Sequence, residues 1–367
     1  MRTKAAVAGA QGEPLTITEL ELDEPRPDEV RVRMVASGVC HTDAIVRDQW
    51  YPTPLPAVLG HEGAGVVEAV GDAVTSVKPG DHVLLSFDHC GRCDNCASGH
   101  PAYCREQFPR FFGGRRGDGS TAFTSADGTA VSSHFFGQSS FAAYSNVAER
   151  SVVKVPDDAP LELLAPLGCG IQTGAGSVLN VLAPPAGSSI AIFGAGAVGC
   201  SALLAAVVAG CSTIIAVDVV PERLTFAREL GATHTVNSRE VDAVEEIARI
   251  TGGAGAQYAI ETTGIPAVFR QFTDALATRG HGVVVGAAAL GTTAELDIGS
   301  RLPSGITISM VVEGESVPQT FLPLLVKLFE EGRFPFDRLI EHYAIDDINE
   351  AFADSAAGRT LKPVVVF

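Results

Sequence analysis

The chain has 367 residues and a net charge of −17, with 43 acidic against 26 basic side chains. This length suits two domains better than one. Because Lys and Arg do not cluster beyond the isolated pair Arg115 and Arg116, the charge pattern excludes a surface that follows nucleic-acid phosphates. Hydrophobic residues make up 46% of the chain, enough for sizeable cores without disulfides.

The beginning of the chain predicts a cytoplasmic protein. The apolar run after Lys4 ends at once in the polar stretch QGEP, so we expect no secretory leader. In a reducing compartment, clustered cysteines bind metal or carry out redox chemistry. The uncharged segment 187–217 is long enough for a membrane span, but five glycines divide it into strand, turn, helix and strand. That pattern is typical of a buried parallel β-α-β unit, so we expect no membrane association.

The order of predicted elements indicates an α/β fold. Residues 1–170 carry short β-branched runs between Pro/Gly turns, which predict a β-rich domain. Within it, the glycine-rich stretch 113–133 is expected to be an exposed loop rather than a lid over substrate. Residues 171–312 alternate strand and helix, as in a doubly wound parallel sheet. Residues 313–367 hold two amphipathic helices and a final strand, and we expect them to return to the first domain.

Half of the eight cysteines lie in the stretch CGRCDNCASGHPAYC. Their spacing is C-x2-C-x2-C-x7-C, at Cys90, Cys93, Cys96 and Cys104. Turn-forming residues between them allow four sulfurs to converge on one Zn²⁺ in a closed, structural site. An iron–sulfur cluster and a pair of disulfides are the alternatives. We favour zinc, because the fourth cysteine is neither remote nor followed by proline.

A second ligand set is spread along the chain. Cys40 in GVCHTD, His61 in GHEGAGVVEAVG and Cys169 in LGCG all lie in glycine-flanked turns. Two thiolates and an imidazole would leave one zinc position open for water or substrate. Cys200 and Cys211 lack such turns and polar neighbours, so we expect them in the core.

Polar residues beside these ligands predict catalytic roles. Asp43 is placed to orient His61 through the ring nitrogen that does not bind metal. Glu62 is placed to reach the metal from outside the shell of direct ligands. Thr42 offers a hydroxyl for proton transfer. On its own, a threonine at this position is more typical of a capped turn.

The stretch IAIFGAGAVG, residues 190–199, predicts a dinucleotide site. It places G-x-G-x-x-G between a β-branched run and an alanine-rich helix, at Gly194, Gly196 and Gly199. The pyrophosphate would lie at the helix N-terminus. Asp218, at the end of the next strand, suits a ribose 2′-hydroxyl and repels a 2′-phosphate, so NAD is favoured over NADP.

Four motifs follow one another along the chain: GVCHTD, GHEGAGVVEAVG, the four-cysteine loop, and GAGAVG followed by Asp218. In this order they resemble the motifs of the zinc-dependent alcohol dehydrogenases of the medium-chain dehydrogenase/reductase superfamily, and the resemblance covers almost the whole chain. The resemblance implies a GroES-like catalytic domain and a Rossmann domain. It implies one catalytic zinc on Cys40, His61 and Cys169 and one structural zinc on the four-cysteine loop. It also implies contacts to NAD from His41, Thr173, Ala197, Val198, Arg223, Val285 and Lys362.

The resemblance further implies reversible oxidation of an alcohol to its aldehyde, with Thr42 accepting the proton. Many relatives carry a histidine at the position of Ile45, so the proton must leave by another path here. Ser86 stands where enzymes for short alcohols often have a bulky aromatic residue, which implies a wider site. The expected apolar lining of that site consists of Trp50, Phe108, Phe135, Phe136 and Val311. These features resemble the aryl-alcohol (benzyl alcohol) branch.

Three other functions remain open from the sequence. They are a dehydrogenase of terpenoid or other allylic alcohols, a glutathione-dependent formaldehyde dehydrogenase, and a structural protein that binds NAD without catalysis. The family resemblance also suggests that the segment ITISMVV joins sheets across a two-fold axis, in a homodimer or homotetramer.

Overall fold

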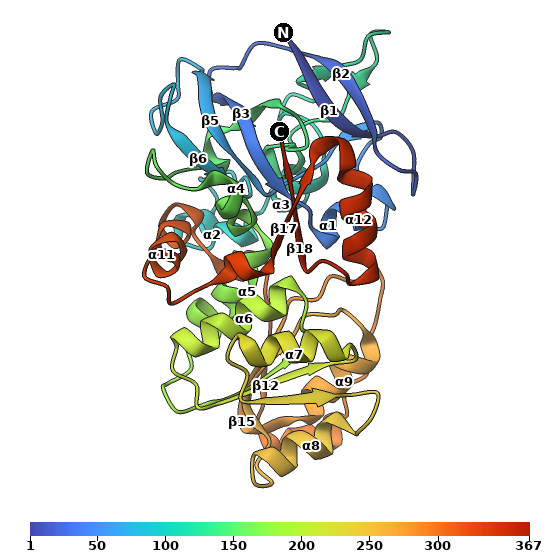
Figure 1. Cartoon of the computed structure of the whole chain (residues 1–367), viewed down its shortest axis with the longest axis vertical. Helices are drawn as coiled ribbons and strands as arrows, with labels where there is room; N and C mark the ends of the chain where they lie inside the picture. The colour runs from blue at the N-terminus through green and yellow to red at the C-terminus, as the bar shows by residue number, and fades with distance from the viewer. The chain divides into compact units, whose positions relative to one another are not determined.

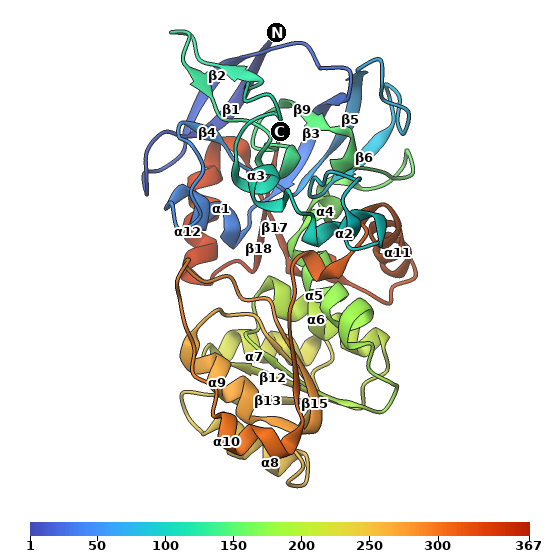
Figure 2. The same ribbon diagram turned by 180° about the vertical axis from the view of Figure 1, so that it is seen from behind.

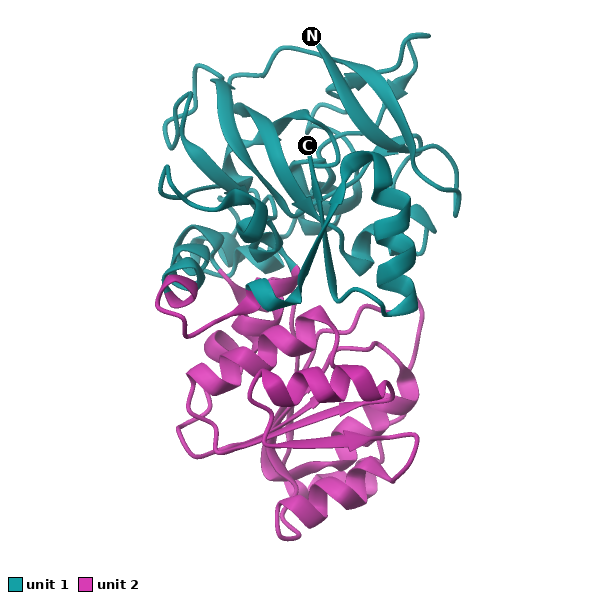
Figure 3. Ribbon diagram, viewed as in Figure 1, with its two compact units in different colours: residues 1–169, 317–327, 337–367 teal, residues 170–316, 328–336 magenta.

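The computed structural model describes residues 1–367 as two compact units (Figure 3). The first unit contains residues 1–169, 317–327 and 337–367, and the second contains residues 170–316 and 328–336. The segment 313–367 is therefore divided between the two units.

The first unit is built on two sheets (Figure 1). The smaller sheet has the order β4 (Ala57–Val58), β1 (Arg2–Ala8), β2 (Thr16–Leu22), β7 (Phe123–Thr124), β8 (Ala130–Val131). The larger sheet has the order β10 (Val152–Lys154), β6 (His82–Leu85), β5 (Gly63–Val70), β3 (Glu29–Gly38), β18 (Lys362–Val366), β17 (Ile340–Ala344), and β9 (Tyr144–Ala148) also pairs with β3. The last strand of the chain thus lies beside β3 and runs antiparallel to it.

Alternation along β3 explains the core of this unit. Val30, Val32 and Met34 are buried against Val67 and Leu85 on neighbouring strands, as expected for a strand whose alternate side chains face one core. The helices of the unit are α1 (His41–Arg47), α2 (Asp94–Ala97), α3 (Gln107–Phe112), α4 (Leu161–Leu164), α12 (Ile348–Ala357) and the part of α11 (Pro318–Glu330) up to residue 327.

The expectation of an exposed loop over 113–133 is confirmed for residues 117–119 and 126–130, which are exposed, but it is wrong for the buried parts of the stretch. Its second half contains the two-residue strands β7 and β8, in which Phe123 and Val131 are buried. In its first half, the guanidinium of Arg116 donates to Glu29 at 2.6 Å and to Asp23 at 2.7 Å. These long-range partners fix the stretch against the first unit, and nothing in the local sequence indicates them.

The second unit is a parallel six-stranded sheet (Figures 1 and 2). Its order is β13 (His234–Asn237), β12 (Thr213–Asp218), β11 (Ser189–Phe193), β14 (Ala256–Glu261), β15 (Leu276–Val284), β16 (Thr307–Met310). In order of appearance this is 3-2-1-4-5-6, the order of a doubly wound dinucleotide-binding fold. The predicted α/β fold with a Rossmann sheet is confirmed.

Helices cover both faces of this sheet. α6 (Ala197–Val208) and α7 (Pro221–Glu229) lie on one face, and α8 (Ala243–Ile250) and α9 (Pro266–Asp274) on the other (Figures 1 and 2). The unit also contains α5 (Gly170–Gly176), followed by a π-helical turn (Ser177–Leu182), and α10 (Ile298–Arg301). In the core, the rings of Phe193 and Phe272 meet edge to face. The segment 187–217 forms β11, α6 and β12, and no helix is both long and apolar enough for a membrane span.

Candidate metal and nucleotide sites

Four side chains from distant parts of the sequence converge in the first unit. The sulfurs of Cys40 and Cys169, a ring nitrogen of His61 and a carboxylate oxygen of Glu62 all lie within 4.8 Å of one another. Cys40 follows β3, His61 and Glu62 precede β5, and Cys169 follows a short turn. The end of β3 must be glycine, because a Cβ at Gly38 would collide with the carboxylate of Glu62.

The imidazole of His61 is oriented as a metal ligand. Its Nδ1 lies 3.0 Å from Oδ1 of Asp43, and its Nε2 is buried without a hydrogen-bond partner. Burial opposes a charged ring, but the carboxylate of Asp43 outweighs it and raises the pKa of His61 well above its ordinary value. A buried, unpartnered nitrogen beside two sulfurs fits a cation, and a carboxylate on the other nitrogen is the usual support for such a ligand.

The same cluster contains an ion pair that sequence reasoning did not foresee. Nζ of Lys362 lies 2.7 Å from Oε1 of Glu62 and 3.3 Å from the carbonyl oxygen of Val39, and Lys362 is only 2% exposed. Burial raises the pKa of Glu62 to about 7 although Lys362 opposes the shift. The two residues are 300 positions apart, so only the pairing of β18 with β3 brings them together. The predicted contact of Lys362 with a pyrophosphate stays a prediction.

Besides Asp43, three residues of α1 carry predictions from the sequence. The hydroxyl of Thr42 lies 3.8 Å from the sulfur of Cys40, where it can exchange a proton with a group bound beside that sulfur. His41 is the first residue of the helix and is exposed. Ile45 is buried, and its hydrocarbon side chain has no donor or acceptor that could pass a proton to solvent.

Aromatic rings surround His61. Phe136 stacks on the imidazole with the ring centroids 4.6 Å apart, and Phe135 meets its edge at 5.3 Å. The contacts continue outward, since Phe112 lies 5.4 Å from Phe136 and 5.0 Å from the exposed ring of Phe108. A continuous series of rings therefore leads from the surface of the first unit to His61, a predicted metal ligand.

The other residues predicted to line a substrate pocket lie in different surroundings. Trp50 is exposed in the first unit, and Val311 is buried in the second. Ser86 is completely buried, and its hydroxyl donates to the carbonyl oxygen of Gly168 at 2.8 Å. This hydrogen bond ties Ser86 to the turn that precedes Cys169.

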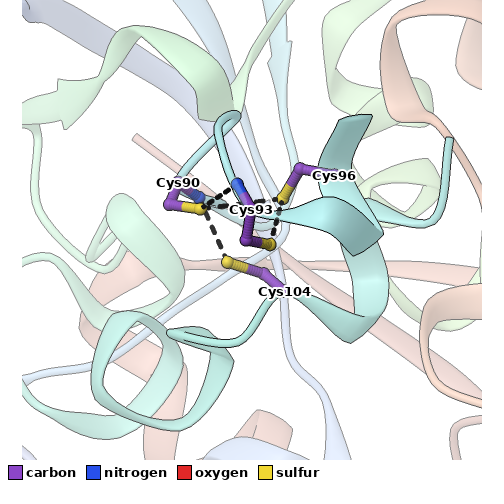
Figure 4. Close-up of side chains that lie close together, drawn as sticks. All are labelled: Cys90, Cys93, Cys96 and Cys104. Atoms are coloured by element: carbon purple, nitrogen blue, oxygen red, sulfur yellow. Dashed lines mark hydrogen bonds between the residues drawn. The ribbon is translucent and has the colours of Figure 1, made fainter. Parts of the chain in front are cut away.

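The four-cysteine loop forms a second cluster, shown in Figure 4. The four sulfurs lie within 4.8 Å of one another, and the Cys93–Cys96 and Cys90–Cys96 pairs are 3.4 and 3.9 Å apart. A disulfide would need about 2 Å, whereas four thiolates at zinc–sulfur bond lengths of about 2.3 Å lie roughly 3.8 Å from each other. All eight cysteines are free thiols. The spacing therefore fits a tetrahedral metal ion and not disulfides.

Backbone amides prepare this loop for a cation. N–H groups of Arg105 and Cys96 lower the pKa of Cys93 to about 6, and the N–H of Cys93 donates to the sulfur of Cys90 at 3.3 Å. Such hydrogen bonds favour the thiolate form that binds metal. Cys200 is buried in α6 and Cys211 is half-buried after it, and neither belongs to either cluster.

The glycine motif of the second unit has the geometry that a dinucleotide requires. Gly194 has a φ of +94° directly after β11, and Gly196 precedes the first turn of α6, which begins with Ala197 and Val198 and has no side-chain cap. A Cβ at Gly199 would collide with the carbonyl of Gly194, so a larger residue would open this turn. No side chain caps this helix N-terminus, where a pyrophosphate would bind.

Asp218 connects the end of β12 to this turn. Its carboxylate accepts hydrogen bonds from the amides of Ala195 at 2.6 Å and of Val219 at 2.7 Å. Arg223 Nη1 is 4.0 Å from the same carboxylate. The acidic group lies at the carboxyl end of the strand, as a ribose-binding residue should.

Two further residues that are predicted to contact the coenzyme lie in the same unit. Thr173 is buried in α5, and its neighbour Gly174 has no Cβ because one would collide with the carbonyl of Val198. α5 therefore packs closely against the start of α6. Val285 follows β15, and its amide donates to the carbonyl of Glu261 at 2.9 Å.

The chain is similar to known proteins over most of its length. A family model described as "Alcohol dehydrogenase GroES-like domain" matches residues 26–157, and one described as "Zinc-binding dehydrogenase" matches residues 197–331. Geraniol dehydrogenase of Castellaniella defragrans is 44% identical over 99% of this chain and 97% of its own length.

Two solved structures are similar over 100% of this chain and 99% of their own chains. The alcohol dehydrogenase zinc-binding domain protein from Burkholderia ambifaria is 59% identical, with a TM-score of 0.98. Benzyl alcohol dehydrogenase from Acinetobacter calcoaceticus is 51% identical, with a TM-score of 0.97. Both predicted domains are therefore matched, and the chain belongs to the zinc-dependent alcohol dehydrogenases of the medium-chain dehydrogenase/reductase superfamily.

Proposed function

We propose that the protein oxidises a bulky, aromatic primary alcohol to its aldehyde with NAD⁺, and that the reaction is reversible. The observation that carries this proposal is the buried, unpartnered Nε2 of His61 beside the sulfurs of Cys40 and Cys169. These three residues would hold the catalytic zinc, and the four-cysteine loop would hold the structural one.

A zinc ion held by the three ligands would supply a Lewis acid that lowers the pKa of an alcohol hydroxyl. The chain's own residues then have separate tasks. Thr42, beside the sulfur of Cys40, accepts the hydroxyl proton. Asp43 keeps the ring of His61 oriented, and Lys362 neutralises Glu62 beside the ligands.

NAD is the proposed oxidant because of Asp218. Its buried carboxylate lies at the carboxyl end of β12 and is already fixed by backbone amides. A ribose 2′-hydroxyl can donate to it, whereas a 2′-phosphate would be repelled. His41, Thr173, Arg223, Val285 and Lys362 are proposed as further coenzyme contacts.

The aromatic rings next to His61 support an aromatic substrate. Phe108, Phe112 and Phe136 form a series of contacting rings that ends on the imidazole. A flat aryl group packs well against such faces and edges. The 51% identity to a benzyl alcohol dehydrogenase agrees with this assignment.

A terpenoid alcohol is the second candidate, favoured by the 44% identity to a geraniol dehydrogenase. An allylic hydrocarbon chain also suits apolar rings, so the site chemistry does not separate the two classes. A glutathione adduct of formaldehyde is less suitable, because its carboxylates would need cationic partners. The aromatic pair Trp50 and Tyr51 offers none.

The proposal is tested by metal analysis together with turnover. We expect two zinc ions per chain and NAD⁺ reduction with benzyl alcohol at a higher kcat/KM than with geraniol or S-hydroxymethylglutathione. Cys169→Ser should abolish turnover and remove one zinc, and Cys211→Ser should change neither. One zinc or none in the wild-type protein, or turnover that survives Cys169→Ser, would contradict the proposal.

We further propose that the protein is a homo-oligomer of the reducing cytoplasm. β16 is an edge strand of the six-stranded sheet, and Met310 at its end is 66% exposed. Other large apolar side chains are exposed just before it, at Leu290, Leu296, Ile298 and Leu302. A second copy would cover this sheet edge and the apolar surface beside it. Sedimentation of Met310→Glu against the wild type would test this, and a wild-type monomer would contradict it.

A further inference from the structure

The side chain of Gln138 joins backbone groups that carry metal ligands. Gln138 is completely buried in the first unit. Its Nε2 donates to the carbonyl oxygen of His61 at 2.8 Å and to that of Ser86 at 3.0 Å. Its Oε1 accepts from the amide of Gly63 at 3.1 Å. Both N–H groups and the carbonyl of this amide are thus used, and the turn that bears His61 is held at two points.

Ser86 extends this connection to the third ligand. Its hydroxyl donates to the carbonyl oxygen of Gly168, the residue before Cys169, at 2.8 Å. A Cβ at Gly168 would collide with the carbonyl of Leu85, so the two backbones can approach only at a glycine. Through Gln138 and Ser86, the turn of His61 and the turn of Cys169 are therefore linked by hydrogen bonds.

Asp43 makes the matching connection to the first ligand. Its Oδ2 accepts from the amide of Cys40 at 2.9 Å, while Oδ1 accepts from the amide of Gly60 and contacts His61 Nδ1, both at 3.0 Å. Each ligand-bearing turn is thus tied to the turn of His61 by a buried side chain. Asp43 does this on the side of Cys40, and Gln138 with Ser86 on the side of Cys169.

The backbone around Gln138 is strained in a way that suits this task. His134, Phe136 and Ser139 have φ values of 60°, 53° and 52°, which cost about 1 kcal/mol or more each for residues other than glycine. The strain is held in place by Ser139, whose hydroxyl donates to the carbonyl of Val58 at 2.7 Å. This backbone conformation allows Phe136 to stack on the ring of His61. The side chain of Gln138, two residues later, reaches the backbone of His61.

We propose that Gln138 is a positioning residue that sets the distance between the ligand atoms of His61 and Cys169. The proposal rests on the zinc site proposed above. Gln138 does not touch the three ligand atoms, so its effect must be on metal geometry and retention. Losing its hydrogen bonds would leave buried backbone groups unpaired and let the two turns separate.

The test replaces zinc with ¹¹³Cd and records its NMR spectrum for the wild type, Gln138→Met and Asn146→Leu. The wild type should give two resonances, one for the four-sulfur site and one for the site with nitrogen. Methionine fills a similar volume without the amide, so Gln138→Met should shift or broaden only the second resonance. A chelator should remove that metal about 10-fold faster than from the wild type.

Asn146→Leu is the matched control. Asn146 is also completely buried in the first unit and hydrogen-bonded, but its partners are Arg31 and Asp23. This variant should lose stability and leave both resonances unchanged. If Gln138→Met behaves in the same way, the role of Gln138 is only structural and the inference is overturned.

Two further outcomes distinguish a failure of this inference from a missing metal site and from a variant that does not fold. A single resonance in the wild-type protein would contradict the proposed catalytic metal site itself. If Gln138→Met does not fold, Ser86→Ala decides, because it removes only the hydroxyl that reaches Gly168. A change confined to the nitrogen-containing site supports the inference, and an unchanged spectrum with unchanged metal release overturns it.

Discussion

The carboxylate of Asp43 contacts Nδ1 of His61 at 3.0 Å and thereby leaves Nε2 directed at the sulfurs of the ligand cluster. Because the same carboxylate accepts from the amide of Cys40 at 2.9 Å, one side chain fixes two ligands.

Replacing Asp43 by asparagine should therefore weaken metal binding without removing a ligand. Asparagine supplies one acceptor where three donors converge, so His61 loses its fixed tautomer. We expect the affinity for zinc at this site to fall about 10- to 100-fold, measured by competition with a chelator. Asp81→Asn is the control, since Asp81 is a buried carboxylate of the same unit paired with Lys78 and Lys154. Equal zinc loss in both variants would refute a specific role for Asp43.

The four-cysteine loop should contribute to the stability of the folded chain and not to catalysis. In Cys93→Ser, the zinc content should fall from two ions per chain to one, and the free energy of unfolding should fall by about 2 kcal/mol or more. Urea titration and elemental analysis measure both. Cys211→Ser, outside both clusters, should keep two ions. A Cys93→Ser protein with two zinc ions would show that the loop does not bind the metal.

Asp218 should determine the choice of coenzyme. Asp218→Asn removes the negative charge but keeps a side chain of the same size, so we expect the KM for NAD⁺ to rise about 10-fold and activity with NADP⁺ to become measurable. Steady-state kinetics with both coenzymes test this. Asp242→Asn changes an exposed helix cap in the same unit and should leave both KM values as they are. Unchanged coenzyme preference in Asp218→Asn would count against the predicted ribose contact.

Glu29 should make the first unit sensitive to acid. Burial by itself would raise the pKa of Glu29, but hydrogen bonds with His134 and Arg116 lower it from 4.5 to about 2. Because its pKa is lowered in the folded state, ionised Glu29 stabilises the fold at pH values above its unfolded-state pKa of 4.5. This contribution is lost as the pH falls towards 2. After allowance for solvent screening, it amounts to about 2 kcal/mol.

The comparison with Glu29→Gln isolates this contribution. In urea titrations, the stability difference between the wild type and the variant should be largest near pH 6 and should shrink between pH 4.5 and 2. Glu149→Gln alters a partly exposed carboxylate of the same unit and should show a smaller change. A wild-type advantage that is constant across this pH range would mean that Glu29 does not titrate as expected.

The sequence predicts those parts of the site whose residues lie close together in the chain. The cysteines at 90–104 and the glycines at 194–199 are recognisable by spacing, because short turns leave little freedom in how their atoms converge. Cys40, His61 and Cys169 are far apart in the chain and are grouped by their glycine-flanked turns and polar neighbours, a grouping that the family resemblance also implies. The structure agrees with that grouping by placing their ligand atoms within 4.8 Å of one another.

The features that the sequence does not reveal depend on contacts between residues that are far apart in the chain. Glutamine at 138 belongs to no motif, and its three backbone partners lie on two other segments. The stretch 113–133 has the composition of a loop, yet Arg116 reaches Glu29 across 87 positions. Ser86 was interpreted as a residue of a wide pocket, but its hydroxyl faces backbone. In each case a hydrogen bond formed by tertiary packing overrides the local pattern.

The pairing of Lys362 with Glu62 has a consequence for biosynthesis. The ammonium that neutralises the carboxylate beside the predicted ligands lies on β18, which is synthesised after all of those ligands and pairs with β3. A nascent chain halted before this strand would have synthesised every ligand cysteine and histidine, yet it would hold Glu62 uncompensated. The proposed catalytic centre can therefore be completed only after β18 has been synthesised and has paired with β3.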